Sequence, residues 1–473
     1  MRGFSDSRRY NLAPTVFFMS LKPLIYQAFG FIKQALSKKY LCKIKSLENK
    51  TLSTTISLIA DIFNKINMIS YDKKYIPQEK LDLKNKTRTS ILPWRGQFSP
   101  ELVELFIKVY SNTNHVVLDP FAGSGTTLFE AARQGLSCYG TDINPAAVEM
   151  AKTAHFINLK ISDRERLIKL AETIVAENLL PFTGDLFFYG FAQEQKDLDQ
   201  HEIEEKFIFK ILKQAQNEEL LHNLLVNAII NYSQQRQPRN LLDFKKSLQK
   251  HINIIKSLPY SLQPCNVIHQ DARYIPLTDH SVDIVITSPP YINVFNYHQN
   301  NRRVMEMLGW DLLTIAKSEI GANRKHRQNR FLTVVQYALD MLDVLKEIRR
   351  LISKDGRVIL IIGRESSVRG VRFENSKLVA ALAIGGAGFE IDLLQERKFQ
   401  NKFGEIIYED ILHLLPINND ELVDDNFATE LAIEILTSVS KNAESDIYKE
   451  IIDAKKRAKL VHKSPLFKIN NFL

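Results

Sequence analysis

The sequence predicts an α/β protein built on a mostly parallel sheet. Short runs of β-branched residues alternate with amphipathic helical stretches in two separate parts of the chain. A glycine-rich turn joins the first of these strands to a helix, and a highly charged helical stretch separates the two parts. Alternation of this kind is typical of right-handed βαβ units, whose strands are parallel. With 473 residues the chain exceeds one ordinary domain, so we expect additional segments around this core.

The first α/β part occupies residues 86–155. A helix is expected after Ser99, with Pro100 in its first position and Ser99 as its cap. A strand over 116–118 and a glycine turn lead into the helix 127–134, and residues 137–142 form the next strand. This order of strand, turn, helix and strand is one complete βαβ unit.

The second part occupies residues 261–417. The expected strands cover 267–271, 282–286 and 357–362, the expected helices cover 331–353 and 376–385, and a final hairpin pairs 389–394 with 405–415. The hairpin would add antiparallel strands to the end of the sheet. Three further segments complete the prediction: a helical, basic N-terminal extension (1–85), a helical insertion (156–260) and a helical C-terminal tail (418–473).

The composition indicates which kind of partner and which cellular compartment to expect. The formal net charge of +9 and the pI near 9.1 suit a polyanionic partner. The three cysteines are widely spaced without a C-x-x-C pair, which argues against a zinc site or a disulfide framework and fits a reducing cytoplasm. The apolar stretch 12–32 is interrupted by Pro14, Lys22 and Pro23, so we expect neither a membrane span nor a signal peptide, and Met19 is an alternative start.

The glycine turn is the run Asp119-Pro120-Phe121-Ala122-Gly123-Ser124-Gly125-Thr126. Glycines let the backbone approach a ligand, and the following helix offers free N–H groups. Leu128 stands where a dinucleotide site would have its third glycine, and Asp119 suits an amine better than a pyrophosphate. Asp142 ends the next strand, where a carboxylate can accept both hydroxyls of a ribose. These features predict a site for S-adenosylmethionine, with a plain helix-capping turn as the alternative.

A second motif, Thr287-Ser288-Pro289-Pro290-Tyr291, follows an apolar strand and so lies at the carboxyl edge of the sheet. The nitrogen of a base amine is a poor nucleophile because its lone pair is delocalised into the ring. The Ser288 side chain and the Pro289 carbonyl could accept its two protons and free the lone pair, while Pro290 stiffens the loop. Tyr291 offers a face for a base removed from its stack. A proline-rich turn with an aromatic plug is the alternative.

At these residues the chain resembles the amino-type DNA methyltransferases, which modify cytosine N4 or adenine N6. The resemblance covers about residues 92–155 and 265–415. It includes residues 92–100, similar to the segment that helps hold the methionine end of the cofactor, and the F-x-G-x-G run 121–125. It also includes residues 270–272, where Asp271 would face the adenine amino group, and the catalytic tetrapeptide 288–291. The resemblance implies a Rossmann-like methyltransferase fold. The residues it implies in the cofactor site are Phe98, Asp119, Phe121, Gly123, Gly125, Thr126, Asp142 and Asp271.

The resemblance also bears on the target. Serine in the first place of the tetrapeptide is commonest in cytosine-N4 enzymes, and Asp or Asn is commoner in adenine-N6 and RNA-modifying relatives, so cytosine N4 is favoured. Double-stranded DNA is the expected partner, and a cognate restriction endonuclease could accompany it. The alternatives are an adenine-N6 enzyme, an RNA base methyltransferase on the same fold, and a degenerate DNA-binding subunit without activity.

Two segments could read the DNA. The helical insertion falls between Asp142 and Asp271, which is not the usual place of a target-recognition domain in the family. The second candidate is the segment 297–330 beyond the catalytic loop, which could neutralise phosphates unless it is only a solvated charged helix. Its basic residues are Arg302, Arg303, Arg324, Lys325, Arg327 and Arg330.

Overall fold

The computed structural model describes residues 54–84, 86–94, 96–182, 200–235, 240–292, 296–322, 326–401, 403–417 and 425–468. The chain divides into two compact units, residues 1–58 and residues 59–473. Most of the predicted N-terminal extension, including the apolar stretch 12–32, lies outside the described residues. Within the described ranges, no helix is both long enough and apolar enough to cross a membrane.

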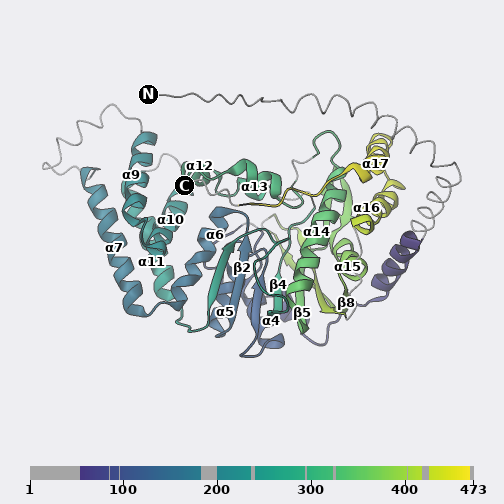
Figure 1. The fold of residues 1–473 in the computed structure, drawn as a ribbon, viewed down its shortest axis with the longest axis horizontal. Coiled ribbons are helices and arrows are strands. Elements are labelled where there is room, and N and C mark those ends of the chain that lie inside the picture. Colours follow the sequence, from purple (N-terminus) through teal and green to yellow (C-terminus); the bar gives the residue numbers. More distant parts are fainter. Residues whose placement is uncertain are drawn as a thin grey trace, which may run out of the picture. The chain divides into compact units, whose positions relative to one another are not determined.

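A seven-stranded sheet forms the centre of the larger unit (Figure 1). In spatial order its strands are β3 (Cys265–His269), β2 (Ser137–Asp142), β1 (Val116–Asp119), β4 (Val282–Thr287), β5 (Ile352–Gly363), β9 (Ile406–Pro416) and β8 (Phe389–Gln400). The first five are parallel, whereas β9 runs antiparallel to both of its neighbours. The predicted parallel sheet with an antiparallel C-terminal hairpin is therefore confirmed.

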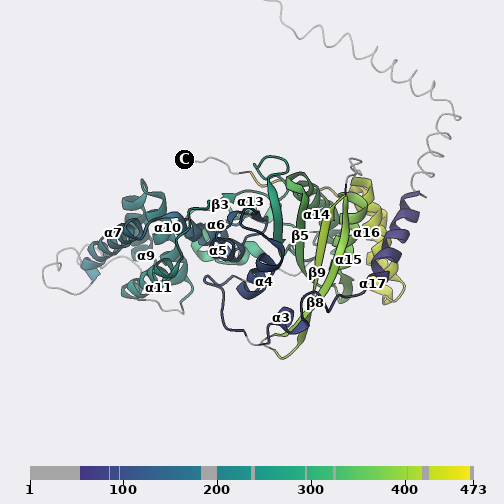
Figure 2. The same ribbon diagram turned by 90° about the horizontal axis from the view of Figure 1, so that it is seen from below.

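Alternating side chains of the central strands feed two apolar cores. Val117 and Ile284 belong to one core, while Leu118 and Val285, their neighbours along the strands, belong to the other. Such strands are apolar on both faces because helices cover both faces. On one face lie α4 (Pro100–Tyr110), α5 (Thr126–Arg133) and α6 (Pro145–Ala151), and on the other α14 (Leu332–Leu351), α15 (Asn375–Gly386) and α16 (Asp425–Ser440) (Figure 2).

The long connection between β2 and β3 is helical in its described parts. It contains α7 (Ile161–Leu179), α9 (Gln200–Ala215), α10 (Glu219–Ser233) and α11 (Phe244–Ser257). The core of these helices is continuous with the core under the sheet. The side-chain amides of Asn223 and Asn227 both donate to the backbone carbonyl of Glu149 at 2.8 Å, which fixes α10 to α6. The insertion is thus packed onto the edge of the α/β core.

Several local features differ from the prediction. Helix α4 starts at Pro100 as expected, but Ser99 makes no side-chain capping bond, and its backbone carbonyl accepts from Leu102 and Val103 instead. The sequence analysis did not anticipate α6 or the other short elements. These are α12 (Arg302–Met307), α13 (Leu312–Ser318) and the hairpin β6 (Glu365–Val368) and β7 (Val371–Glu374). Helices α3 (Gln78–Asp82) and α17 (Ser445–Arg457) lie in the terminal segments that were expected to be helical. Beyond α17, residues 461–468 return to the sheet without regular structure.

Candidate cofactor and catalytic site

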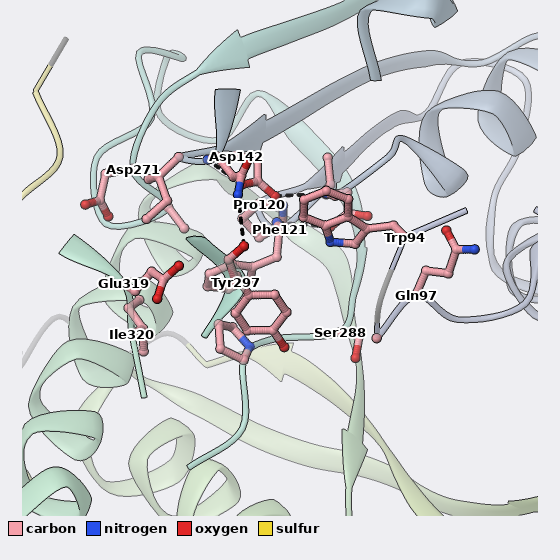
Figure 3. A pocket seen from close by; sticks show the side chains of 18 of the residues that line it. Trp94, Gln97, Pro120, Phe121, Asp142, Asp271, Ser288, Tyr297, Glu319 and Ile320 are labelled. Carbon is pink, nitrogen blue, oxygen red and sulfur yellow. Dashed lines mark hydrogen bonds between the residues drawn. The ribbon is translucent and has the colours of Figure 1, made fainter. Parts of the chain in front are cut away.

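A cavity of about 880 Å³, measured to its opening, lies at the carboxyl ends of β1, β2 and β4 (Figure 3). Doubly wound sheets bind ligands at this edge. The predicted site residues that line it are Phe98, Asp119, Phe121, Gly123, Thr126, Asp142, Asp271, Ser288 and Pro290. The fold therefore brings the glycine turn and the catalytic loop to one cavity.

Asp119 ends β1 and is 1% exposed. Its carboxylate accepts hydrogen bonds from the Thr127 and Thr287 hydroxyls, each at 2.6 Å, and from the backbone N–H of Phe121 at 3.1 Å. Burial raises the pKa of Asp119 to about 6, although these three hydrogen bonds lower it. Asp119 thus joins the glycine turn, α5 and the end of β4, and its predicted contact with the cofactor amine stays a prediction.

The glycine turn brings the backbone close to the cavity. Gly123 has φ +52° and Gly125 has φ +90°, a region that favours glycine. A Cβ on Gly123 would lie 2.9 Å from Cδ1 of Trp94, so the indole packs directly on the turn. Gly125 precedes α5 and lies behind the cavity wall, where a Cβ would meet the backbone of Ala151 at 3.0 Å.

Asp142 ends β2 and lines the same cavity. Its Oδ2 accepts from the backbone N–H of Gly123 at 3.0 Å, and its Oδ1 accepts from that of Asn144 at 2.8 Å. Burial raises the pKa of Asp142 to about 7; the two hydrogen bonds lower it, and the nearby charges of Asp119 and Glu319 raise it. Each oxygen accepts from one backbone N–H group and can accept one more hydrogen bond, as a ribose diol requires.

Asp271 also lines the cavity, but its carboxylate is already saturated. Oδ1 accepts from the backbone N–H and Nε of Arg273, and Oδ2 accepts from its Nη2 and from the backbone N–H of Phe467, all at 2.7–3.0 Å. A carboxylate oxygen accepts about two hydrogen bonds. In this structure the partners of the Asp271 carboxylate are a buried arginine and the C-terminal segment, and its expected contact with the adenine amino group stays a prediction.

Arg273 connects this wall to distant parts of the chain. Its side chain is 1% exposed and forms ion pairs with Asp271 at 2.7 Å and Asp340 at 2.9 Å. Its guanidinium also donates to the backbone carbonyls of Ser464 and Pro465. The Phe467 ring lies against His269, with 4.7 Å between ring centroids. Residues 464–467 therefore support the cavity wall at Asp271.

The catalytic loop follows β4. Ser288 lines the cavity, and its Oγ lies 3.2 Å from the hydroxyl of Tyr291. The Tyr337 hydroxyl donates to the Pro290 carbonyl at 2.9 Å, which anchors the loop on α14. Pro289 is buried, and Tyr291 lies outside the cavity with its ring packed against Gly363. The predicted stacking of a base on Tyr291 stays a prediction.

Several cavity residues were missed in the sequence because they lie in loops without a recognisable pattern. They are Asn144, Tyr297, Glu319 and Ile320. Trp94 and Gln97, which also line the cavity, belong to the segment 92–100 that the resemblance links to the cofactor (Figure 3). The Glu319 carboxylate accepts from both the backbone N–H and Nδ1 of His298, the latter at 2.7 Å. Asn144 Nδ2 donates to the Tyr297 carbonyl at 3.1 Å. These bonds hold the segment after the catalytic loop over the cavity.

The predicted basic DNA-binding residues do not form one patch in the described structure. Arg302 pairs with Glu306 of its own helix at 2.7 Å, and Arg303 pairs with Glu204 of α9 at 3.2 Å. Arg327 lines a second cavity together with His298 and Lys317, whereas Arg330 is partly buried. Arg324 and Lys325 lie outside the described residues. DNA contact by this segment stays a prediction.

The lining of the cavity fits S-adenosylmethionine in its chemistry. Asp142 can receive the ribose, the Gly123 turn leaves room for close backbone approach, and Trp94 and Tyr297 present aromatic rings to the same space (Figure 3). Aromatic faces attract cations such as a sulfonium. The buried carboxylates of Asp119 and Glu319 add negative charge beside that cation.

Comparison with known proteins places this site in a family. Residues 96–354, more than half of the chain, match the family model described as D12 class N6 adenine-specific DNA methyltransferase. Residues 35–153 match a second model, described as DNA methylase. The matched ranges contain the glycine turn, the catalytic loop and most of the cavity.

Similar curated proteins carry names of the same kind. Type II methyltransferase M.MjaII of Methanocaldococcus jannaschii is 20% identical over 68% of this chain and 83% of its own length. M.BsoBI of Geobacillus stearothermophilus is 24% identical over 48% of this chain and 54% of its own. M.MvaI of Kocuria varians is 45% identical, over 12% of each chain.

Solved structures with similarity to the chain include a SAM-dependent methyltransferase from Methanosarcina mazei, which is 11% identical with a TM-score of 0.31. The alignment covers 66% of this chain and 98% of that one. At that score the structural similarity adds no weight, and the assignment depends on the family models and the cavity. The chain belongs to the amino-type DNA methyltransferases, and its cofactor is S-adenosylmethionine.

Proposed function

We propose that the protein methylates the N4 amine of cytosine in double-stranded DNA, with the target base flipped out of the helix. The observation that supports this target is Ser288 in the first place of the catalytic tetrapeptide, at the wall of the cofactor cavity. Serine in this place is commonest among the cytosine-N4 enzymes that the chain resembles. Flipping is required because the amine of a stacked, paired base is out of reach of a cofactor in a closed cavity.

In this proposal the loop activates the amine through two acceptors. Ser288 Oγ and the Pro289 carbonyl accept the two amine protons, which moves the nitrogen toward a tetrahedral geometry and exposes its lone pair. The bond between Tyr337 and the Pro290 carbonyl keeps the loop in place before the base arrives, and this preorganisation lowers the barrier. The bound cofactor would supply the methyl group and keep the C–S electrons on its sulfur. The amine nitrogen would provide the electrons of the new N–C bond, and its surplus proton would leave to water.

Adenine N6 is the second candidate, supported by the match to the D12 class model. The two amines have the same chemistry, so the loop itself does not discriminate between them. An RNA base is a third candidate. We further propose that the protein acts as the modification enzyme of a Type II pair, because the similar proteins carry that name.

The test is direct methylation with product identification. Enzymatically amplified genomic DNA, which carries no modified bases, would be incubated with purified protein and labelled cofactor, then digested to nucleosides and separated by mass. N4-methylcytosine is the expected product. N6-methyladenine alone would select the second candidate, while label on RNA and none on DNA would overturn the proposal. Ser288→Ala should abolish turnover and leave cofactor binding unchanged.

A further inference from the structure

A row of three residues crosses strands β5, β9 and β8 beside the catalytic loop. Gly363 pairs with Glu409, and Glu409 pairs with Arg397. Directly opposed residues of antiparallel strands point to the same face, with Cβ atoms about 4.5–5.5 Å apart. The side chains of Glu409 and Arg397 therefore stand next to each other, and the neighbouring place at Gly363 has no side chain.

Tyr291 of the catalytic loop fills that place. A Cβ on Gly363 would lie 2.8 Å from Cε2 of Tyr291. The phenol is thus beside Glu409, whose Oε2 is buried and has no hydrogen-bond partner among the described residues. The same hydroxyl lies 3.2 Å from Ser288 Oγ. Tyr291 consequently lies between the catalytic serine and a carboxylate on β9.

Glu409 and Arg397 form a desolvated ion pair. Their side chains are 14% and 8% exposed, with 3.5 Å between Arg397 Nε and Glu409 Oε2. Among the described residues, neither of these atoms has a hydrogen-bond partner, and nor does Arg397 Nη1. Burial raises the pKa of Glu409, and the adjacent guanidinium lowers it. Because a buried pair contributes little net stability, its place behind the catalytic loop points to a role in the reaction.

A serine needs help to act as the amine acceptor. Its hydroxyl both donates and accepts, whereas an ionised Asp in the same place of a tetrapeptide only accepts. If Tyr291 donated to Ser288, the serine proton would remain free to point at the amine protons. If Tyr291 donates to Glu409, its oxygen receives the Ser288 proton, and the serine lone pairs face the amine. The direction of the hydrogen bonds from Ser288 through Tyr291 to Glu409 therefore decides whether Ser288 can accept a proton of the base amine.

We infer that Glu409 is a positioning residue for methyl transfer: it fixes the direction of the hydrogen bonds that run from Ser288 through Tyr291 to Glu409. This inference rests on the proposed function of the catalytic loop. Glu409 supplies, at the far end of the chain, the negative charge that an Asp in the first place would carry itself. Arg397 balances that charge and holds the carboxylate beside Tyr291.

Single-turnover methylation of amplified DNA with labelled cofactor tests the inference. Glu409→Gln removes the obligate acceptor, and Tyr291→Phe removes the link but keeps the ring and the ion pair. Each should lower the rate about 10- to 100-fold, the contribution of one hydrogen bond to a charged group, with KM for cofactor and DNA within about twofold of wild type. The double variant should be no slower than the slower single variant, because both changes interrupt one chain.

Rescue separates positioning from a merely structural role. Ser288→Asp provides a carboxylate, which only accepts hydrogen bonds and therefore does not need Tyr291 to orient it. Adding Glu409→Gln to this variant should have little further effect on the rate. Glu390→Gln, at an exposed site of the same hairpin, is the matched control and should retain the wild-type rate. Thermal melting would verify that each variant is folded, and Tyr291→Phe tests the chain even if Glu409→Gln does not fold.

The inference is overturned if folded Glu409→Gln methylates within twofold of wild type, or if the two losses multiply in the double variant. It is also overturned if Glu409→Gln is equally damaging in the Ser288→Asp background. Failure of the proposed function would look different, because wild-type protein itself would then label no DNA.

Discussion

Cofactor affinity should fall as the pH decreases through the pKa of Asp142. Burial raises this pKa to about 7, and the carboxyl must be ionised to accept a ribose hydroxyl on each oxygen. Protonation places a hydrogen on one of the two oxygens and removes an acceptor. The sign is therefore fixed: affinity approaches its maximum at about pH 8 and above, and it decreases as the pH falls through 7.

The size of the effect follows from the pKa. For a group with this pKa, the ionised fraction is roughly nine-tenths at pH 8 and roughly one-tenth at pH 6. If only the ionised form binds, the apparent dissociation constant rises about tenfold across this interval, or about 1.4 kcal/mol. Asp119 titrates lower, at about 6, so the upper half of the interval reports mainly on Asp142.

Calorimetric titration between pH 6 and pH 8 would measure this dependence. An α-amine titrates in the same range, so the ligand should include 5′-methylthioadenosine, which keeps adenine and ribose but has no amine. Asp142→Asn should bind about tenfold more weakly at pH 8 and lose most of the pH dependence. Asp355→Asn, at an exposed site on β5, is the matched control and should bind as wild type.

Two results would refute this reasoning. An Asp142→Asn variant with an unchanged tenfold dependence would place the titrating group elsewhere. Affinity for 5′-methylthioadenosine that rises toward pH 6 would show that the protonated carboxyl is the binding form.

Three further changes test other parts of the site. Gly123→Ala should weaken cofactor binding at least about tenfold, because a left-handed backbone costs a non-glycine residue about 1–2 kcal/mol and the new Cβ would lie 2.9 Å from Trp94. An unchanged affinity in calorimetry would contradict this expectation. Arg273→Met leaves two buried carboxylates unpaired and should destabilise the protein by about 3–5 kcal/mol in chemical denaturation, whereas a loss below 1 kcal/mol would show that they are solvated. Gly363→Ala should displace the Tyr291 ring and lower kcat while KM for the cofactor stays constant, and an unchanged kcat would mean that the ring tolerates displacement.

The sequence predicts the sheet well because its signals are local. The strand ending at Asp119 and the strand before Ser288 are apolar runs that end in motifs, and parallel strands bring their carboxyl ends to one edge. Asp142 was identified for the same reason. A residue at the end of a strand can thus be located from the apolar run that precedes it in the sequence.

The residues that the sequence analysis missed depend on contacts between distant segments. Nothing around Glu319 indicates that it meets His298 at the cavity wall, and nothing around Glu409 indicates that Tyr291 will lie beside it. Asp271 lines the cavity as expected, but a short motif does not reveal its bonds to Arg273 and to the C-terminal segment. A local sequence pattern therefore indicates where the backbone of a site lies. Packing between distant segments decides which of its polar atoms remain available to a ligand.

The contact between Arg273 and Ser464 spans 191 positions of the chain. Contacts this distant in sequence close late in folding, since the entropy of a long loop must be overcome first. The glycine turn and Asp142 can be in place much earlier, because they belong to one local βαβ unit. During synthesis, a half-made chain would therefore possess the ribose end of its cofactor site before the wall at Asp271 exists.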